Sequence, residues 1–385
     1  MILPTTHISA LLLLIVSFVC LGSWINTFKL AGPRWRFELF YIDFAVGAVL
    51  FSVIAAFTLG SLGSDLAFTD RMLVAGRGAQ VFVIAAGAVF NLGNMLLVAA
   101  VSLLGIAGAF PFSVGLALVI TSFFQFGHGH PWMLLIPGIL LIMAAVVLDG
   151  SACRLRERFS GTGTRHTTET KSSKDAVAAG PTPRATAAAK PGARVSSGAA
   201  TMQSAHRAGA PSSKSRGRKS AKGLVIATIS GLALGFVKPI AARGMTGDFG
   251  LGPYAGLLML SLGVLLATIT LNFYFLNIAI DGEPLKFGAY FRGNLRQHLL
   301  GFGGGALWAI GTLTALLGNS VPGQSGVGRA LFVFLPLASV LLAMAWGVLK
   351  WKEFASANGR AKVAFGWTAV LYLSGLVVLG VAFTR

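Results

Sequence analysis

The stretch 87–108, GAVFNLGNMLLVAAVSLLGIAG, is long and apolar, yet it carries Asn91 and Asn94 one helical turn apart. At a shift of 218 residues it lies over 305–326, GALWAIGTLTALLGNSVPGQSG. The positions that coincide are Gly87/Gly305, Ala88/Ala306, Gly93/Gly311, Ser102/Ser320, Gly105/Gly323 and Gly108/Gly326. An internal copy of this kind in a membrane protein predicts two similar halves with a shared site between them.

The composition is that of a helical membrane protein. The chain is 55% hydrophobic and 11% charged, and its mean hydropathy is +0.76. A soluble domain carries about 25% charged residues. Several apolar runs approach the roughly 20 residues that a helix needs to cross a bilayer. We therefore expect an all-α polytopic membrane protein.

Ten apolar segments predict ten transmembrane helices. They group into a first five-helix repeat (1–150), a linker (151–222) and a second five-helix repeat (223–385). The first Lys, Lys29, follows the first apolar run, so this run is expected to stay as a helix and not to be cleaved as a signal peptide. The predicted helices are 8–28, 40–62, 80–103, 107–126, 131–148, 223–242, 254–278, 299–317, 328–349 and 363–383.

The linker 151–222 differs from both halves. It is rich in Ala, Ser, Thr, Gly and Pro, and it holds 15 Lys or Arg against three acids. Such a segment cannot bury enough apolar surface to offset its ordering entropy. It is predicted to be a disordered, basic, cytoplasmic segment, with an arm that binds lipid or nucleic acid as the alternative. Because most of the net charge of +19 comes from this linker, we expect no nucleic-acid partner.

The two halves align in a second register, and charge gives their orientation. Leu21-Gly22 matches Leu234-Gly235, and Tyr41 matches Tyr254, at a shift of 213. Five helices per half require repeats that are inverted in the membrane. If the linker lies inside, 25 of the 31 Lys and Arg lie on the inner side. When the linker is left out of the count, ten Lys and Arg lie on the inner side and six on the outer side. The positive-inside rule then predicts that both termini lie outside. The abundance of Ala, Gly and Arg suggests a bacterial inner membrane.

Polar and aromatic residues within the predicted helices are the candidates for the site. Each polar group in hydrocarbon is costly unless it finds a partner or water. If the two halves face each other, these groups surround one cavity near the midplane. Amides and hydroxyls beside aromatic faces suit a neutral polyhydroxy or amide solute. The predicted substrate-binding residues are Trp24, Asn26, Asn91, Asn94, Lys238, Trp308 and Thr312.

The predicted site is asymmetric, and some of its residues have structural alternatives. In the copied stretch, Ala309 and Thr312 stand where the first half has Asn91 and Asn94, so the segment 80–103 supplies the amides and 299–317 the aromatic wall. The two asparagines could instead join helices by hydrogen bonds. Lys238 could instead hold a structural partner, and Trp24 could instead belong to an interfacial aromatic belt.

Asp43 is a candidate for coupling transport to a proton or sodium ion. It lies near the start of the segment 40–62, where an intramembrane carboxylate is a functional candidate. The alternative is an ion pair with Lys29 or Arg36. Lys29 itself is expected to be a cytoplasmic anchor whose side chain reaches the interface.

No enzymatic constellation is present in the sequence. It has no G-x-S-x-G, no H-E-x-x-H and no phosphate-binding loop. Cys20 and Cys153 have no neighbours at metal-ligand spacing, and His128 and His130 are expected to be a simple loop pair. We therefore expect no enzyme activity, no cofactor and no metal.

Several motifs resemble a known transporter superfamily. The run Gly22-Ser23-Trp24-Ile25-Asn26-Thr27-Phe28-Lys29, followed by Tyr41-Ile42-Asp43-Phe44, resembles the first two helices of the glucose/ribose porter and ureide permease families of the drug/metabolite transporter superfamily. Lys222-Gly223, Gly252-Pro253-Tyr254 and Trp346-Gly347 with Lys352-Glu353 also fit. The resemblance covers both halves but not the linker. It implies ten helices in two inverted five-helix repeats, and solute uptake driven by an ion gradient or by the solute gradient.

The residues and the resemblance together predict a secondary transporter that works by alternating access. Its expected partner is a small polar solute, most specifically a sugar, besides the membrane lipids. Plant ureide permeases carry a nucleotide-binding-like motif in the central loop, which this chain lacks. The transport alternatives are a ureide or nucleobase permease and a metabolite or drug exporter. The non-transport alternative is a membrane scaffold or sensor that binds anionic lipids through the linker.

Overall fold

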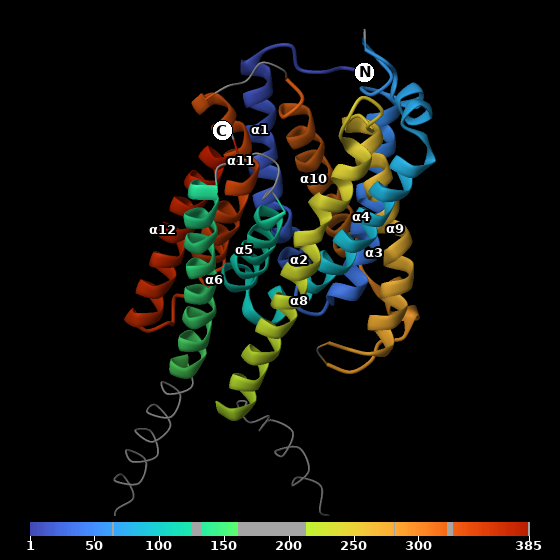
Figure 1. Ribbon diagram of the computed structural model, residues 1–385. Coiled ribbons are helices and arrows are strands. Elements are labelled where there is room, and N and C mark those ends of the chain that lie inside the picture. Colours follow the sequence, from blue (N-terminus) through green and yellow to red (C-terminus); the bar gives the residue numbers. More distant parts are fainter. Residues whose placement is uncertain (64, 125–131, 161–212, 281, 322–325, 384–385) are drawn as a thin grey trace, which may run out of the picture.

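The computed structural model describes residues 1–63, 65–124, 132–160, 213–280, 282–321 and 326–383, and these ranges contain helices and no strand (Figure 1). The first half comprises α1 (His7–Ser23), α2 (Ile25–Ala31), α3 (Phe37–Phe57), α4 (Phe68–Leu104), α5 (Ile106–Phe123) and α6 (Trp132–Ser160). The second half comprises α8 (Ser213–Met245), α9 (Pro253–Asn277), η1 (Phe287–Arg292), α10 (Leu295–Gly318), α11 (Gly326–Ala345), η2 (Trp346–Lys350) and α12 (Gly359–Ala382).

The helices are apolar enough to make this a multi-pass membrane protein. In the described ranges, nine helices are long and apolar enough to cross a membrane, and a shorter apolar helix covers Phe334–Lys350. Figure 1 shows Met1 and the end of α12 at one end of the bundle, which we call the terminal end. The other end, where α6 stops and α8 starts, we call the linker end.

Three helix boundaries differ clearly from the sequence-based expectation: the start of α4, the end of α6 and the start of α8. α4 begins at Phe68, not at residue 80, because Gly76 (φ +71°) joins two helical segments across a kink. The side chain of Gln80 donates to the carbonyl of Met72 at 2.9 Å and ties the segments together. α6 continues to Ser160 and α8 starts at Ser213, so both helices extend into the segment expected to be linker. Residues 161–212 lie outside the described part of the chain.

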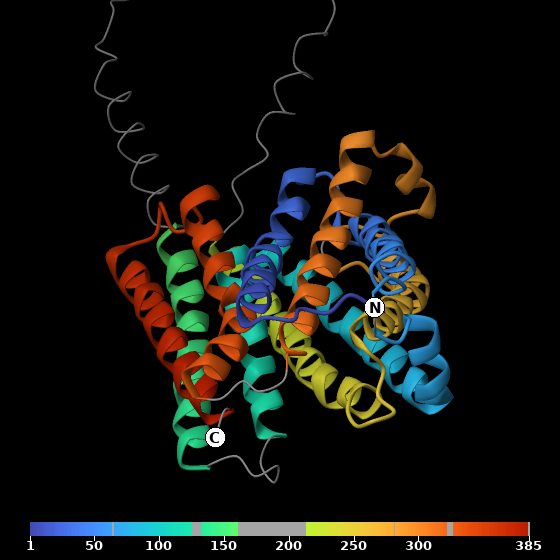
Figure 2. The ribbon, with the colours of Figure 1, turned by 90° about the horizontal axis from the view of Figure 1, so that it is seen from above.

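The helices pack in pairs that match between the halves. α4 packs against α8 and α9, while α10 packs against α1 and α3. α5 packs against α8, and α11 packs against α1. α6 and α12 pack together along one edge of the bundle, and α3 and α9 along the other (Figure 2).

Contacts at repeated glycines follow the two sequence registers. A Cβ added to Gly93 would lie 2.8 Å from Leu234, and one added to Gly311 would lie 2.8 Å from Leu21. Leu21 and Leu234 are the residues matched at a shift of 213, and Gly93 and Gly311 are matched at 218. The same leucine-on-glycine contact therefore occurs twice, each time between a helix of one half and a helix of the other.

Gly87 and Gly305 allow backbones to touch. At Gly87, α4 meets α9 so closely that an added Cβ would lie 3.0 Å from the Cα of Gly263. At Gly305, α10 meets α3, and an added Cβ would clash with the carbonyl oxygen of Phe44. Small residues permit this approach where no hydrophobic effect drives helices together in lipid. The glycines at these two contacts therefore have a structural role.

We expect Gly305→Ala to destabilise the protein by about 1–3 kcal/mol, because the added methyl group overpacks the contact between α10 and α3. Gly303→Ala is the matched control, since nothing lies within 4 Å of its added Cβ. It should leave stability unchanged or raise it by up to about 1 kcal/mol. Thermal unfolding of both variants in detergent measures the difference, and equal melting temperatures would contradict the packing argument.

Candidate functional site

A cavity of about 360 Å³ lies between the two halves. Its walls come from α1, α4 and α5 of the first half and from α8, α9, α10 and α11 of the second. Most lining residues are apolar, and Thr121, Ser122 and Ser339 add hydroxyl groups. Five of the seven sequence-predicted residues line this cavity: Trp24, Asn94, Lys238, Trp308 and Thr312.

The two tryptophans are held in an aromatic cluster. The ring of Trp308 stacks on Phe90 with centroids 4.6 Å apart. Phe44 lies between the tryptophans, 5.1 Å from Trp24 and 5.9 Å from Trp308, and is fully buried. Trp24 is 2% exposed, so it belongs to the interior and not to a lipid-facing aromatic belt. The aromatic wall thus draws on α1, α3, α4 and α10.

The two asparagines have different positions. Asn94 lines the cavity, and its Nδ2 donates to the hydroxyl of the buried Tyr41 at 2.8 Å. This bond uses one amide hydrogen and leaves the second hydrogen and Oδ1 for another partner. Asn91 does not line the cavity. Its Oδ1 accepts from the hydroxyl of Thr268 at 3.0 Å, so it joins α4 to α9 in the way that the helix-joining alternative describes.

Lys238 lies where the hydrogen-bond ladder of α8 is interrupted. Pro239 has no N–H, so the carbonyl of Gly235 loses its partner within the helix. The hydroxyl of Thr121 on α5 donates to that carbonyl at 3.0 Å and replaces the lost bond. The side chain of Lys238 is exposed at the cavity wall, with Nζ 5.6 Å from the ring centroid of Phe383.

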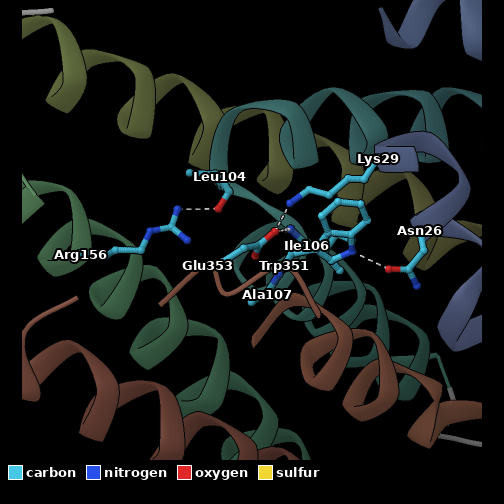
Figure 3. Close-up of polar contacts among 8 residues, drawn as sticks. All are labelled: Asn26, Lys29, Leu104, Ile106, Ala107, Arg156, Trp351 and Glu353. Atoms are coloured by element: carbon cyan, nitrogen blue, oxygen red, sulfur yellow. Dashed lines mark hydrogen bonds and ion pairs between the residues drawn. The ribbon is translucent and has the colours of Figure 1, made fainter. Parts of the chain in front are cut away.

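Asn26 lies outside the cavity, in a polar cluster at the linker end (Figure 3). At the centre of this cluster is Glu353, whose side chain is 8% exposed. Its Oε1 pairs with Lys29 and accepts the backbone N–H of Ile106 at 2.8 Å. Its Oε2 accepts the N–H of Ala107 at 2.8 Å. A carboxylate at this position caps the N-terminus of α5 and interacts favourably with its dipole.

Local backbone geometry places the Glu353 carboxylate. Gly105 has φ +85°, and a Cβ on it would lie 2.5 Å from Oε2 of Glu353, so this position needs glycine. Glu353 follows the π-helix η2 and Lys352, which has φ +51°, and its own N–H donates to Gly347. A left-handed lysine is uncommon, and π-helical turns often occur at functional sites.

Other contacts join the polar cluster around Glu353 to the surrounding helices. The indole N–H of Trp351 donates to Oδ1 of Asn26 at 2.7 Å, and Lys29 lies over the Trp351 ring. Arg156 donates to the carbonyl of Leu104 at 2.6 Å (Figure 3). A second space of about 680 Å³ lies here and is lined by Lys29 and Glu353, among others. It shares no lining residue with the central cavity.

Asp43 is buried and pairs with the second half of the chain. Its Oδ1 accepts from the hydroxyl of Tyr290 at 2.5 Å, and its Oδ2 lies 3.0 Å from Nδ1 of His298. The proposed pairing with Lys29 or Arg36 is wrong: Lys29 pairs with Glu353, and Arg36 with Glu38. Burial and the bond to Asp43 raise the pKa of the Tyr290 hydroxyl, which therefore stays a donor.

The sequence-based reasoning gave no site role to Glu353, Tyr290 and His298, and it did not single out Asp149. Asp149 is fully buried in α6, and its carboxylate has no hydrogen-bond partner within the described residues. An acidic residue in an apolar segment was the available signal for Asp149. His128 and His130 lie outside the described residues.

No protein-family model and no curated protein matches the chain. A solved structure described only as "Crystal structure of protein" is similar over 97% of each chain, with 15% sequence identity and a TM-score of 0.48. A likeness at this level carries no argument about fold or function.

We expect loss of the Glu353 carboxylate to destabilise the protein more than loss of its lysine partner. Glu353→Ala removes the cap of two N–H groups together with the ion pair, whereas Lys29→Met leaves the cap in place. Breaking a mostly buried pair and leaving its partners unsatisfied costs about 3 kcal/mol. Thermal unfolding in detergent compares the variants, with the exposed Glu283→Ala as control. An equal effect of all three would contradict the capping role.

Proposed function

We propose that this protein is a secondary transporter that moves a small polar solute across the membrane by alternating access. The observation that carries this proposal is the cavity between the halves, where Trp24, Asn94, Lys238, Trp308 and Thr312 converge. Concave sites with apolar walls and a few convergent polar groups are typical ligand sites. The separate space at the linker end supplies the second face that alternating access needs.

The proposed scaffold is ten transmembrane helices in two inverted five-helix repeats. The apolar helix Phe334–Lys350 would add a tenth span to the nine longer ones. It would be the ninth in chain order. The paired contacts Leu21/Gly311 and Leu234/Gly93 support equivalent halves, as do the matching helix pairs. Repeats of this kind can rock against each other around a fixed central site.

The proposed solute is a sugar or a close sugar derivative. The resemblance to the glucose/ribose porter family favours it, and an amide, hydroxyl groups and two indole rings at one cavity suit a hydroxylated solute. A ureide or nucleobase permease and a metabolite or drug exporter are the other transport candidates. A lipid-binding scaffold is the candidate outside transport. We propose no enzymatic reaction, no cofactor and no nucleic-acid partner.

The proposed orientation places the linker in the cytoplasm and both termini outside, in a bacterial inner membrane. The cavity then lies toward the outer face, and the Glu353 cluster closes the cytoplasmic face. Asp43 remains the candidate for binding a coupling proton or sodium ion. Its contact with His298 joins α3 to α10, so a change in its charge would act on the packing between the halves.

We expect a solute from a panel of sugars, sugar acids, ureides and nucleobases to raise the melting temperature of the purified protein, because a ligand stabilises the state that binds it. Asn94→Leu should abolish this shift and the uptake of the same solute into proteoliposomes. Asn277→Leu is the control, since Asn277 is exposed and donates to Phe273 away from the cavity.

Deleting 160–215 should preserve uptake. If nothing in the panel binds and the deletion abolishes binding to anionic vesicles, the scaffold role is favoured.

We expect Glu353→Gln to open the linker end. Val114 is half-buried and lines the cavity, so Val114→Cys places a thiol there in a protein whose Cys20 and Cys153 are replaced by Ala. A membrane-impermeant maleimide should label this thiol from the terminal end only, and from both ends after Glu353→Gln. Glu283→Gln is the matched control. Labelling that stays on one side in both variants would show that Glu353 does not hold the linker end closed.

A further inference from the structure

We infer that the solute carries a carboxylate and that Lys238 binds it, which makes the transported class a small hydroxylated organic monoanion. This inference rests on the proposed transport function and names its substrate class. It starts from the charges at the cavity. Among the described residues that line it, Lys238 is the only charged one, and none is an acid.

The ammonium group of Lys238 makes no ion pair within the described residues. Lys29, by contrast, pairs with Glu353, and Arg36 pairs with Glu38. The described contact of Lys238 Nζ is the Phe383 ring. Ionisable groups within membrane helices normally face a partner or a water-filled cavity, and they mark solute pathways.

The energy of this arrangement favours an anionic ligand. Removing an ammonium from water into apolar surroundings is costly unless a counter-charge joins it. Phe110, Val114 and Leu234 are among the apolar walls of the cavity, so a solute that displaces water from Lys238 must replace the lost interactions. A carboxylate does so with a charge-assisted hydrogen bond. A neutral hydroxyl group replaces only part of them.

The count of one cation sets the charge of the ligand. A carboxylate carries one negative charge and is neutralised by Lys238 alone. A phosphate monoester carries about 1.5 to 2 negative charges at neutral pH. It would leave excess charge in an apolar cavity whose described lining residues offer no second cation. The geometry therefore points to a carboxylate.

Several hydrogen-bond donors near the cavity also have no acceptor among the described residues. The second amide hydrogen of Asn94 is free of the Tyr41 bond. Within the described part of the chain, the indole N–H groups of Trp24 and Trp308 make no hydrogen bond, whereas those of Trp346 and Trp351 do. The Thr312 hydroxyl already donates to the carbonyl of Trp308. A ligand rich in acceptors, such as a hydroxy acid, suits this set.

The position of Lys238 is fixed before a ligand binds. The bond from Thr121 to Gly235 ties α8 to α5 one turn before Lys238. A Cβ on Gly235 would lie 2.6 Å from Ile120, so the two helices are in close contact there. The backbone that carries Lys238 is therefore in place before a ligand binds, and binding has to order only the side chain.

The test compares carboxylates with matched neutral compounds. Thermal unfolding of the full-length purified protein is measured against acetate, glycerate and gluconate, and against acetamide, glycerol and glucose. We expect a carboxylate, gluconate above all, to raise the melting temperature with a saturable dose response. Lys238→Met should weaken this binding roughly tenfold to a hundredfold, the range of a charge-assisted hydrogen bond. Lys238→Arg should restore most of it.

Two further variants make the result decisive. Lys222→Met is the matched control, because Lys222 lies on the same helix but donates to the carbonyl of Ile280, away from the cavity. It should keep the gluconate response. Lys238→Gln provides a second neutral variant if Lys238→Met does not elute as a single species on size exclusion.

The outcomes separate this inference from the transport proposal. Glucose that stabilises the wild type and the Lys238 variants equally overturns the anionic class and leaves transport standing. Gluconate that still binds after Lys238→Met and Lys238→Gln shows that Lys238 is an interfacial anchor and overturns the assignment. No response to any of the three carboxylates overturns it too. Only failure of the wider solute panel as well, with no uptake into proteoliposomes, overturns transport.

Discussion

In a bilayer, polar groups find partners inside the protein, and this constraint organises the bundle. Backbone and side-chain groups in hydrocarbon cannot bond to water. Ser230 donates to the carbonyl of Gly93, and Ser52 lies 2.8 Å from Ser261, so hydroxyl groups join helices of opposite halves. Asp43 reaches His298 in the same way. At the central cavity, Lys238 makes no ion pair with a described residue and Asn94 keeps one amide hydrogen free of the Tyr41 bond, so a solute can take the place of a protein partner there.

The halves share a scaffold but not a site. Equivalent contacts at Gly93 and Gly311 hold α4 and α10 in the same relation to their neighbours. The polar groups differ, since the first half brings the Asn94 amide to the cavity and the second brings Lys238. In the proposed transporter, the equivalent helix contacts would set where the cavity lies, and the unlike polar groups of the two halves would set what it can hold.

Sequence reasoning located the elements and much of the cavity because those signals are local. An apolar run with Asn94 or Lys238 inside it is visible without knowing what packs against it. The partners of Glu353 and Asp43 were not predictable in the same way. Glu353 follows a polar turn, and its burial depends on the N-terminus of α5, which lies 246 residues earlier in the chain. The extension of α4 depends on the positive φ of Gly76, which composition does not reveal.

The distribution of paired and unpaired charge also decides which solutes the cavity rejects. At the linker end the Glu353 carboxylate is neutralised by Lys29 and two backbone N–H groups. At the cavity, no described lining residue is an acid that could pair with Lys238. A cation entering this low-dielectric space would meet an ammonium group without any compensating carboxylate, and repulsion there is several times stronger than in bulk water. If Lys238 binds an anionic solute as proposed, the same residue would also exclude cations, which is how selective sites combine attraction with repulsion.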